Sequence, residues 1–437
     1  MNIIHIVVFF APNFGYHGII VSEGMSKYMS QAYFKQMNTG LKQAGIAYPT
    51  LLIDKSRLDQ NIGHLKNALK NTFNFRIVAK SLPSIEMLQY IMTKTATNRL
   101  MCFHLPFVIK IIQSLPDVDI LLGKPMPVDA VRAFYQWYLS DKNTTSFDHE
   151  KKMQWLVDSD ARLQNYESLA RSLGITLNIN LEIDIGLHRG GYNNDLEFIE
   201  SLERIKSSSS LTLSGLMGYE AHITKIPAFL GGPEKAELSA KANYRHFVKL
   251  VRDHYGDTEN LCLNAGGSTT YPLYGDDDVC NEISTASALV KPSDFDVYTL
   301  KHHQAATFIA APILKKVNKP ELPMAKSIST FLRAIKLVPE HACFIYGGNW
   351  LAKPCYPKSA KHLTIFGSSS NQEMYSLPDK NDLQEEDFIF FRPTQSEATF
   401  LQFGKIALYE HGKIVDWWSV FDYPDLTPLS QTILKTA

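Results

Sequence analysis

The stretch FRIVAKSLPSIEML, residues 75–88, combines a short apolar strand, a lysine and the beginning of a helix. Residues 75–79 are typical of a buried strand, and the pattern from Ser84 onwards is typical of a helix. Lys80 therefore stands where the strand ends. A lysine on a protein surface is common, but a lysine at the end of a buried strand either extends its amine to the rim of the sheet or serves a chemical purpose.

The alternation of strand and helix continues from this stretch to about residue 290. We expect strands at 75–79, 99–104, 118–122, 153–157, 176–184, 211–218, 260–264 and 282–289. Such alternation predicts a parallel sheet, and eight repeats predict a closed (β/α)₈ TIM barrel. The fold class is therefore α/β, and we assign residues 55–296 to the barrel domain.

A ninth strand, at residues 49–54, precedes the barrel and must belong to another sheet. After about residue 297, short apolar runs separated by Gly, Pro, Asn and Asp predict a C-terminal antiparallel β-domain. We expect its strands at 307–317, 329–338, 362–368, 387–393 and 405–421, the last with a hairpin turn at 410–413. We assign residues 1–54 and 297–437 to this second domain.

Composition excludes several classes of protein. The 437 residues include 44 Lys+Arg and 44 Asp+Glu, so the formal net charge is zero, and we expect no nucleic-acid partner. No run approaches the roughly 18 apolar residues of a membrane helix. The five cysteines form no CxxC pair, which is typical of a reduced, cytoplasmic protein.

Two motifs are predicted to meet at the C-terminal rim of the barrel, where barrel enzymes have their active sites. Lys80 follows the first strand. The loop LNAGGSTTYPLY, residues 263–274, follows the seventh strand, in a region where barrels commonly bind phosphate. Gly266 and Gly267 allow a close approach of the backbone to an anion, and Ser268 and Thr269 add hydroxyl donors.

A phosphate cradle and a lysine at one rim favour a phosphate-bearing aldehyde held as a Schiff base on Lys80. Pyridoxal 5′-phosphate (PLP) meets this description. A sugar phosphate bound through Lys80 without PLP is the alternative that these two motifs leave open.

Further polar residues follow the fifth and sixth strands. Arg189, in NLEIDIGLHRGGY (180–192), could meet the cofactor ring or a substrate carboxylate; alternatively it forms a structural ion pair with Glu182 or Asp184. Tyr219 and His222, in GLMGYEAHI (215–223), are expected to face the same mouth.

Taken together, these motifs resemble the fold-type III PLP enzymes, in particular the D-threonine aldolase and D-serine dehydratase family, which is related to the alanine racemase N-terminal domain. The resemblance implies that Lys80 holds PLP and that Gly266, Gly267, Ser268 and Thr269 cradle its phosphate. It places Arg189, Tyr219 and His222 around the ring and the substrate. It further implies a homodimer, a small amino acid as substrate, and an upstream strand that belongs to the β-domain. The motifs that carry it are PTLLIDKSRLDQNI (49–62), RIVAKSLPS (76–84), EIDIGLHRGG (182–191), GLMGYEAHI (215–223) and NAGGSTTY (264–271).

The sequence departs from that family at one place. Relatives carry His-x-Cys or His-x-Asp after a proline late in the β-domain, as metal ligands. The matching stretch here is RPTQSEATF, residues 392–400, which offers Gln395 and Glu397. Glutamate can ligate a divalent ion but glutamine does so poorly, so we expect no divalent metal.

The resulting hypothesis is a PLP-dependent lyase, a dehydratase or aldolase acting at Cα and Cβ of a D-amino acid such as D-serine or D-threonine. Lys80 would be the base, and Tyr219 or His222 the acid. An amino-acid racemase without metal and a non-catalytic PLP carrier are the alternatives.

Overall fold

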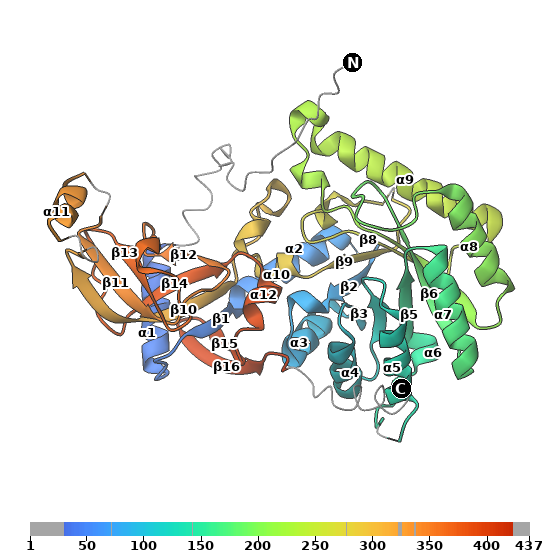
Figure 1. Cartoon of the computed structure of the whole chain (residues 1–437), viewed down its shortest axis with the longest axis horizontal. Helices are drawn as coiled ribbons and strands as arrows, with labels where there is room; N and C mark the ends of the chain where they lie inside the picture. The colour runs from blue at the N-terminus through green and yellow to red at the C-terminus, as the bar shows by residue number, and fades with distance from the viewer. Residues whose placement is uncertain are drawn as a thin grey trace, which may run out of the picture.

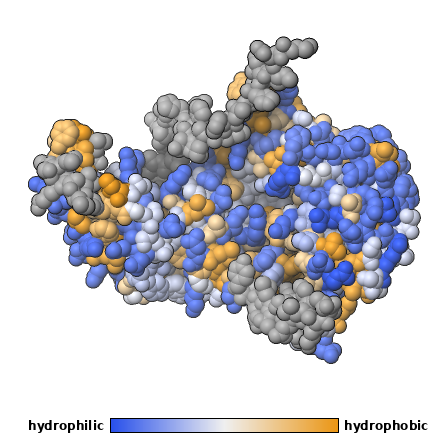
Figure 2. All heavy atoms as spheres, in the orientation of Figure 1, coloured by the Kyte–Doolittle hydropathy of each residue, from blue (hydrophilic) through white to orange (hydrophobic). Residues whose placement is uncertain are grey.

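Two sheets organise the chain, as the computed structural model in Figure 1 shows: a closed barrel and a separate open sheet. The structure describes residues 30–422 except 71, 142, 277, 322–325 and 336–337. The predicted fold class is confirmed, since a (β/α)₈ TIM barrel is joined to a mostly antiparallel second domain. Hydrophilic side chains cover much of the visible face of both domains (Figure 2). Among the described residues, no helix is long and apolar enough to cross a membrane.

The barrel consists of eight parallel strands, each hydrogen-bonded to the next, with the last closing on the first. Helices cover its outside (Figure 1). The strands are β2 (Asn74–Val78), β3 (Arg99–Cys102), β4 (Asp119–Leu122), β5 (Met153–Val157), β6 (Leu177–Ile183), β7 (Leu211–Gly218), β8 (Cys262–Ala265) and β9 (Glu282–Thr285). The helices are α2 (Lys55–Leu69), α3 (Ile85–Thr95), α4 (Leu105–Ser114), α5 (Val128–Tyr138), α6 (His149–Lys152), α7 (Asp160–Leu173), α8 (Asp195–Ser207), α9 (Gly232–His254) and α10 (Ser287–Val290).

The expected eighth strand, 282–289, is twice as long as the strand that forms there. Strand β9 ends at Thr285, and residues 287–290 form the short helix α10. The chain must leave the barrel here to reach the second domain. Asn61 of α2 holds the chain in place at this point, because its Nδ2 donates to the carbonyl oxygen of Leu289 at 2.7 Å.

A buried polar network fills the barrel at the N-terminal ends of its strands. Arg76 is 0% exposed and donates from Nη2 to Glu282 Oε2 at 3.0 Å. Arg99 Nη1 donates to the same oxygen at 2.7 Å, and Asp119 Oδ1 lies 2.7 Å from Arg76 Nη2. Each charge in this network therefore has an opposite charge beside it.

The second domain is an eight-stranded sheet with the main order β12-β14-β10-β1-β15-β16; in addition, β11 pairs with β10, and β13 pairs with β11. Its strands are β1 (Thr50–Asp54), β10 (Thr307–Asn318), β11 (His341–Tyr346), β12 (Ala352–Tyr356), β13 (Gln372–Leu377), β14 (Phe388–Pro393), β15 (Lys405–Glu410) and β16 (Lys413–Ser419). The upstream strand β1 joins this sheet as expected. It pairs antiparallel with β10 but parallel with β15, so the sheet is not purely antiparallel. Helix α1 (Gln31–Gln43) packs on it through Phe34, Met37 and Leu41.

Two predicted strands of this domain are wrong. From Ser329 to Ala334 the chain forms the end of helix α11 (Lys326–Ala334), which agrees with the sequence spacing of Ile328, Phe331 and Leu332 at three and four residues rather than two. Within 362–368 it forms the short 3₁₀ helix η7 (Thr364–Phe366), with only a single bridge from His362 to Tyr375. The hairpin turn at 410–413 is confirmed between β15 and β16.

Candidate active site

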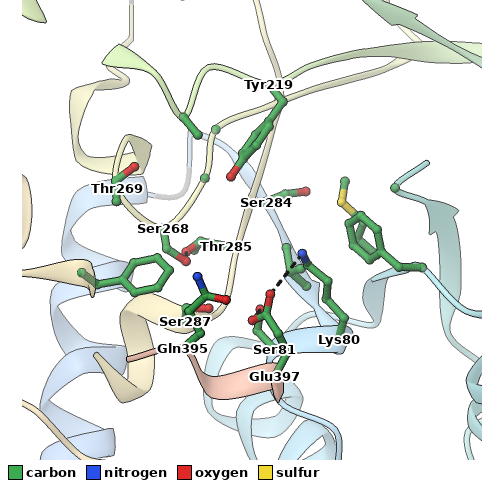
Figure 3. A pocket seen from close by; sticks show the side chains of 18 of the residues that line it. Lys80, Ser81, Tyr219, Ser268, Thr269, Ser284, Thr285, Ser287, Gln395 and Glu397 are labelled. Carbon is green, nitrogen blue, oxygen red and sulfur yellow. Dashed lines mark hydrogen bonds and ion pairs between the residues drawn. The ribbon is translucent and has the colours of Figure 1, made fainter. Parts of the chain in front are cut away.

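A cavity of about 270 Å³ opens at the C-terminal ends of the barrel strands, where the sequence placed the site. Helix α12 (Ser396–Phe400) of the β-domain closes one side of it (Figure 3). Seven predicted residues lie in its wall together with the two doubtful metal candidates: Lys80, Arg189, Tyr219, Gly266, Gly267, Ser268 and Thr269, with Gln395 and Glu397.

Lys80 is positioned by the short segment between β2 and α3. The strand ends at Val78, a 3₁₀ turn η1 (Ala79–Ser81) follows, and Ser84 caps α3 by accepting from the Met87 amide at 3.3 Å. The side chain of Lys80 is 44% exposed and points into the cavity (Figure 3). Its Nζ lies 3.3 Å from Glu397 Oε1 and 4.8 Å from the centre of the Phe103 ring.

The glycine pair begins the loop after β8. Gly266 has φ +85°, and a Cβ there would lie 3.0 Å from Ile283 Cγ2; a Cβ on Gly267 would lie 2.8 Å from Tyr219 Cε2. Both positions therefore require glycine. The amide of Gly266 donates to Glu220 Oε2 at 3.3 Å, so this N–H is already bonded within the protein.

Glu220 lies buried behind this loop and was missed by sequence reasoning. Its carboxyl accepts from the Gly266 amide and from the hydroxyl of Thr270, and so holds both ends of the glycine turn. Burial raises the pKa of Glu220 to about 7. Its position directly after Tyr219 is the only sequence signal it gives.

Hydroxyl groups are more numerous in the cavity than the sequence suggested. Ser268 Oγ lies 2.9 Å from Thr285 Oγ1, at the end of β9. Ser284 and Ser287, from the same segment as Thr285, also line the cavity. The apolar pattern predicts only a strand over residues 282–289; the position of these hydroxyls at the carboxyl end of the eighth strand is the sequence signal that points to them.

Arg189 and Tyr219 lie together. The guanidinium carbon of Arg189 is 4.9 Å from the centre of the Tyr219 ring, and burial raises the pKa of Tyr219. The alternative ion pair with Asp184 is not formed, since Asp184 Oδ2 instead lies 2.7 Å from His188 Nδ1. The pKa of Glu182 is raised by burial, and the nearby charge of Arg189 opposes that rise.

His222 does not lie in the cavity wall, although its neighbour Ala221 does. Strand β7 ends at Gly218, and in the turn that follows, the His222 ring packs against Gly186, with Nε2 3.2 Å from the position of a Cβ on that glycine. Burial lowers the pKa of His222, and the neighbouring His188 lowers it further. The expectation that His222 faces the mouth is not met by this geometry.

The metal candidates have other partners. Gln395 Nε2 donates to Asp294 Oδ2 at 3.4 Å, while Glu397 contacts Lys80 and accepts from Ser81 Oγ at 3.3 Å. In the described part of the chain, no group of three His, Cys, Asp or Glu side chains could hold a metal. Glu397 is a single carboxylate beside the ammonium group of Lys80, and the other candidate, Gln395, is an amide. This set of side chains does not fit a divalent ion.

The chain can now be assigned to a class of protein. The alanine racemase N-terminal domain family matches residues 53–285, which is more than half of the chain, and the chain belongs to this family. No curated protein matches the chain in sequence.

Solved structures with a similar fold carry different activities in their names. D-threonine aldolase from Filomicrobium marinum is 14% identical with a TM-score of 0.64, over 85% of this chain and 96% of its own. D-threo-3-hydroxyaspartate dehydratase from Delftia sp. HT23 is 13% identical (TM-score 0.63, 85% and 97%), and alanine racemase from Clostridium difficile 630 is 15% identical (TM-score 0.61, 85% and 98%). At these identities the likeness shows the fold alone.

The donors that line the cavity fit PLP. The amine of Lys80 points into the same cavity that the glycine loop lines. The lack of a Cβ at Gly266 and Gly267 lets a phosphate approach the backbone, and the hydroxyls of Ser268, Thr269 and Thr285 are donors for its oxygens.

Proposed function

We propose that this protein is a PLP-dependent lyase that acts at Cα and Cβ of a D-amino acid with a β-hydroxyl group, of the dehydratase or aldolase type. One observation carries the proposal: Lys80 and the loop Gly266–Thr269 line a single cavity at the C-terminal end of a family barrel. When bound, PLP withdraws electrons from Cα of an amino acid and makes its proton removable.

The side chains of the chain have distinct roles in this proposal. Lys80 would hold PLP covalently and later remove the Cα proton with its freed amine. Ser268, Thr269 and Thr285 would bind the phosphate. Arg189, stacked on Tyr219, supplies a positive charge for the substrate carboxylate or the cofactor ring.

The contact between Lys80 and Glu397 favours a lyase over a racemase. A racemase needs proton-transfer groups on both faces of Cα, whereas two groups only 3.3 Å apart would serve one face. The racemase is nevertheless the second candidate, because the Tyr219 hydroxyl enters the cavity from β7, away from Lys80 (Figure 3).

Screening the PLP-loaded protein against D- and L-amino acids tests the proposal. Ammonia and a keto acid from D-serine would indicate a dehydratase, and glycine with an aldehyde from D-threonine an aldolase. Loss of chirality with solvent deuterium at Cα would indicate the racemase instead. Bound PLP without turnover of any amino acid would favour a carrier, and a protein that never binds PLP would contradict the proposal and favour the sugar-phosphate alternative.

We also propose that the chain forms a homodimer, in keeping with the resemblance noted from the sequence. Apolar side chains near the pocket-lining Lys225 are exposed, among them Phe229 and Leu230 in the 3₁₀ turn η3 (Ala228–Leu230). Light scattering should give twice the chain mass of 49.4 kDa. A mass equal to one chain would contradict the dimer.

A further inference from the structure

Glu397 is the carboxylate that the fold aims at the candidate lysine. Its Oε1 lies 3.3 Å from Lys80 Nζ, and its Oε2 accepts from Ser81 Oγ at 3.3 Å. The two partners come from the barrel turn η1, whereas Glu397 comes from α12 of the β-domain (Figure 3). The site is therefore assembled across the two domains.

The β-domain holds this carboxylate firmly in place. The amide of Thr394 donates to the carbonyl oxygen of Leu351 at 2.8 Å, and the Thr399 hydroxyl donates to the same oxygen at 3.3 Å. These bonds fix both sides of the segment that carries Glu397. A side chain anchored in this way, and 31% exposed to the cavity, can meet a substrate without a large movement.

Other charged or titratable groups around Glu397 come from two further elements. Tyr219, after β7, is close enough for the charge of Glu397 to raise its pKa. Asp294, from the 3₁₀ turn η5 (Ser293–Phe295), lines the same cavity but is bonded to Gln395. Lys80 is thus the cation that faces Glu397 directly.

We propose that Glu397 is the acid that protonates the departing β-hydroxyl in an elimination, an inference that rests on the function proposed above. Lys80 Nζ takes the proton from Cα, and the C–H electron pair becomes the second bond between Cα and Cβ. The Cβ–O bond breaks, and its electron pair leaves with the oxygen, which takes a proton from the Glu397 carboxyl and departs as water. The unsaturated amine that remains is hydrolysed to a keto acid and ammonia.

The 3.3 Å contact explains how both groups return to their starting states. After one turnover Lys80 carries an additional proton and Glu397 lacks one, so a transfer from Nζ to Oε1 restores both. The same spacing suits two substituents on neighbouring carbons of one substrate. Both would then be on one face, so the elimination is syn.

The test compares two leaving groups in Glu397→Gln. Hydroxide needs a proton to leave, but chloride does not. We expect elimination from D-serine to fall by about 10²- to 10⁴-fold in the variant, whereas elimination from β-chloro-D-alanine falls by less than about fivefold. Covalent attachment of PLP to Lys80, read by absorbance and borohydride trapping, should be unchanged.

Asp59→Asn is the matched control, because Asp59 Oδ2 lies 3.3 Å from Lys94 Nζ outside the cavity. It should leave both eliminations unchanged. Equal losses with both leaving groups in Glu397→Gln would mean that Glu397 only positions Lys80 and would overturn the inference, as would no loss at all. If the unaltered protein binds PLP but eliminates neither compound, the proposed function has failed rather than the role of Glu397.

Discussion

The two ends of the barrel use the same kinds of charged side chain in opposite ways. At the N-terminal end, Arg76 is fully buried and lies between Glu282 and Asp119. At the C-terminal end, Lys80 is 44% exposed, contacts one carboxylate and faces a cavity. The first arrangement satisfies its charges internally, whereas the second leaves donors for a ligand.

The pKa of a carboxyl group at each end reflects this difference. Burial alone would raise the pKa of Glu282, but the charge of Arg76 and the bonds from Arg76 and Arg99 lower it to about 2. For Glu220, behind the glycine loop, burial outweighs its hydrogen bonds and raises the pKa to about 7. A buried carboxyl therefore stays ionised where cations surround it and becomes hard to ionise where only neutral donors do.

The largest effect should come from Lys80→Ala. Because the amine would carry the cofactor and the proton, we expect turnover to fall by at least about 10⁴-fold, or about 5.5 kcal/mol. The unfolding free energy should change little, since the side chain ends in a cavity. Lys94→Ala is the control, matched in exposure (46%) and in its 3.3 Å carboxylate contact. Equal activity of the two variants would contradict the catalytic role that the comparison gives to the C-terminal end of the barrel.

Glu282→Gln should instead lower the stability and leave the activity largely intact. It removes one of the two carboxylates that neutralise the fully buried Arg76, so we expect the unfolding free energy to fall by about 3 to 5 kcal/mol. Activity per folded molecule should persist. Asp129→Asn, which breaks the exposed contact of Asp129 with Arg132, should change stability by no more than about 0.5 kcal/mol. Denaturant unfolding of both variants measures the difference, and similar values would show that the network is not structural.

The pH dependence of stability should reveal Glu220. Its pKa rises from the ordinary 4.5 to about 7 on folding, so the folded form binds the proton more tightly than the unfolded form. Its contribution is present below pH 4.5 and is lost as pH rises through 7, by about 3 kcal/mol. Glu220→Gln should lack this part of the decrease. Parallel stability curves for both proteins would show that Glu220 ionises normally.

Gly266→Ala should give the smallest of these effects. The left-handed φ of +85° and the 3.0 Å approach to Ile283 Cγ2 predict a loss of about 1 to 3 kcal/mol in stability and weaker PLP binding. Gly275→Ala is the control in the same loop, since nothing lies within 4 Å of its Cβ position. A thermal melt of both variants measures the loss of stability, and a PLP titration measures the loss of binding. Equal behaviour would mean that the loop tolerates a side chain.

The sequence allowed much of the barrel to be predicted, because strands buried on both faces are continuous apolar runs. The ranges 153–157 and 211–218 agree with β5 and β7 to the residue. The β-domain was harder, since its short elements carry weaker patterns. A helical spacing of apolar residues was interpreted as a strand in 329–338.

The sequence correctly places a residue in the wall of the candidate cavity where that residue stands at the end of a strand, as at Lys80 or Gly266. The sequence does not predict which side chain of a turn faces the cavity, as for His222. Nor does it predict a contact between segments that are distant in the chain. Glu397 was considered only as a metal ligand, because nothing in the sequence places it against Lys80. Ser284 and Thr285 lie in a segment whose pattern predicts only a strand, so the sequence does not mark their hydroxyls as part of the cavity.

The most direct test of this account is to find which residue carries PLP. The protein incubated with PLP should absorb in the visible range, and after borohydride reduction, mass spectrometry of its peptides should place the pyridoxyl group on Lys80. The same treatment of Lys80→Ala should leave no labelled peptide. A label on another lysine, or equal labelling of Lys80→Ala, would contradict the account.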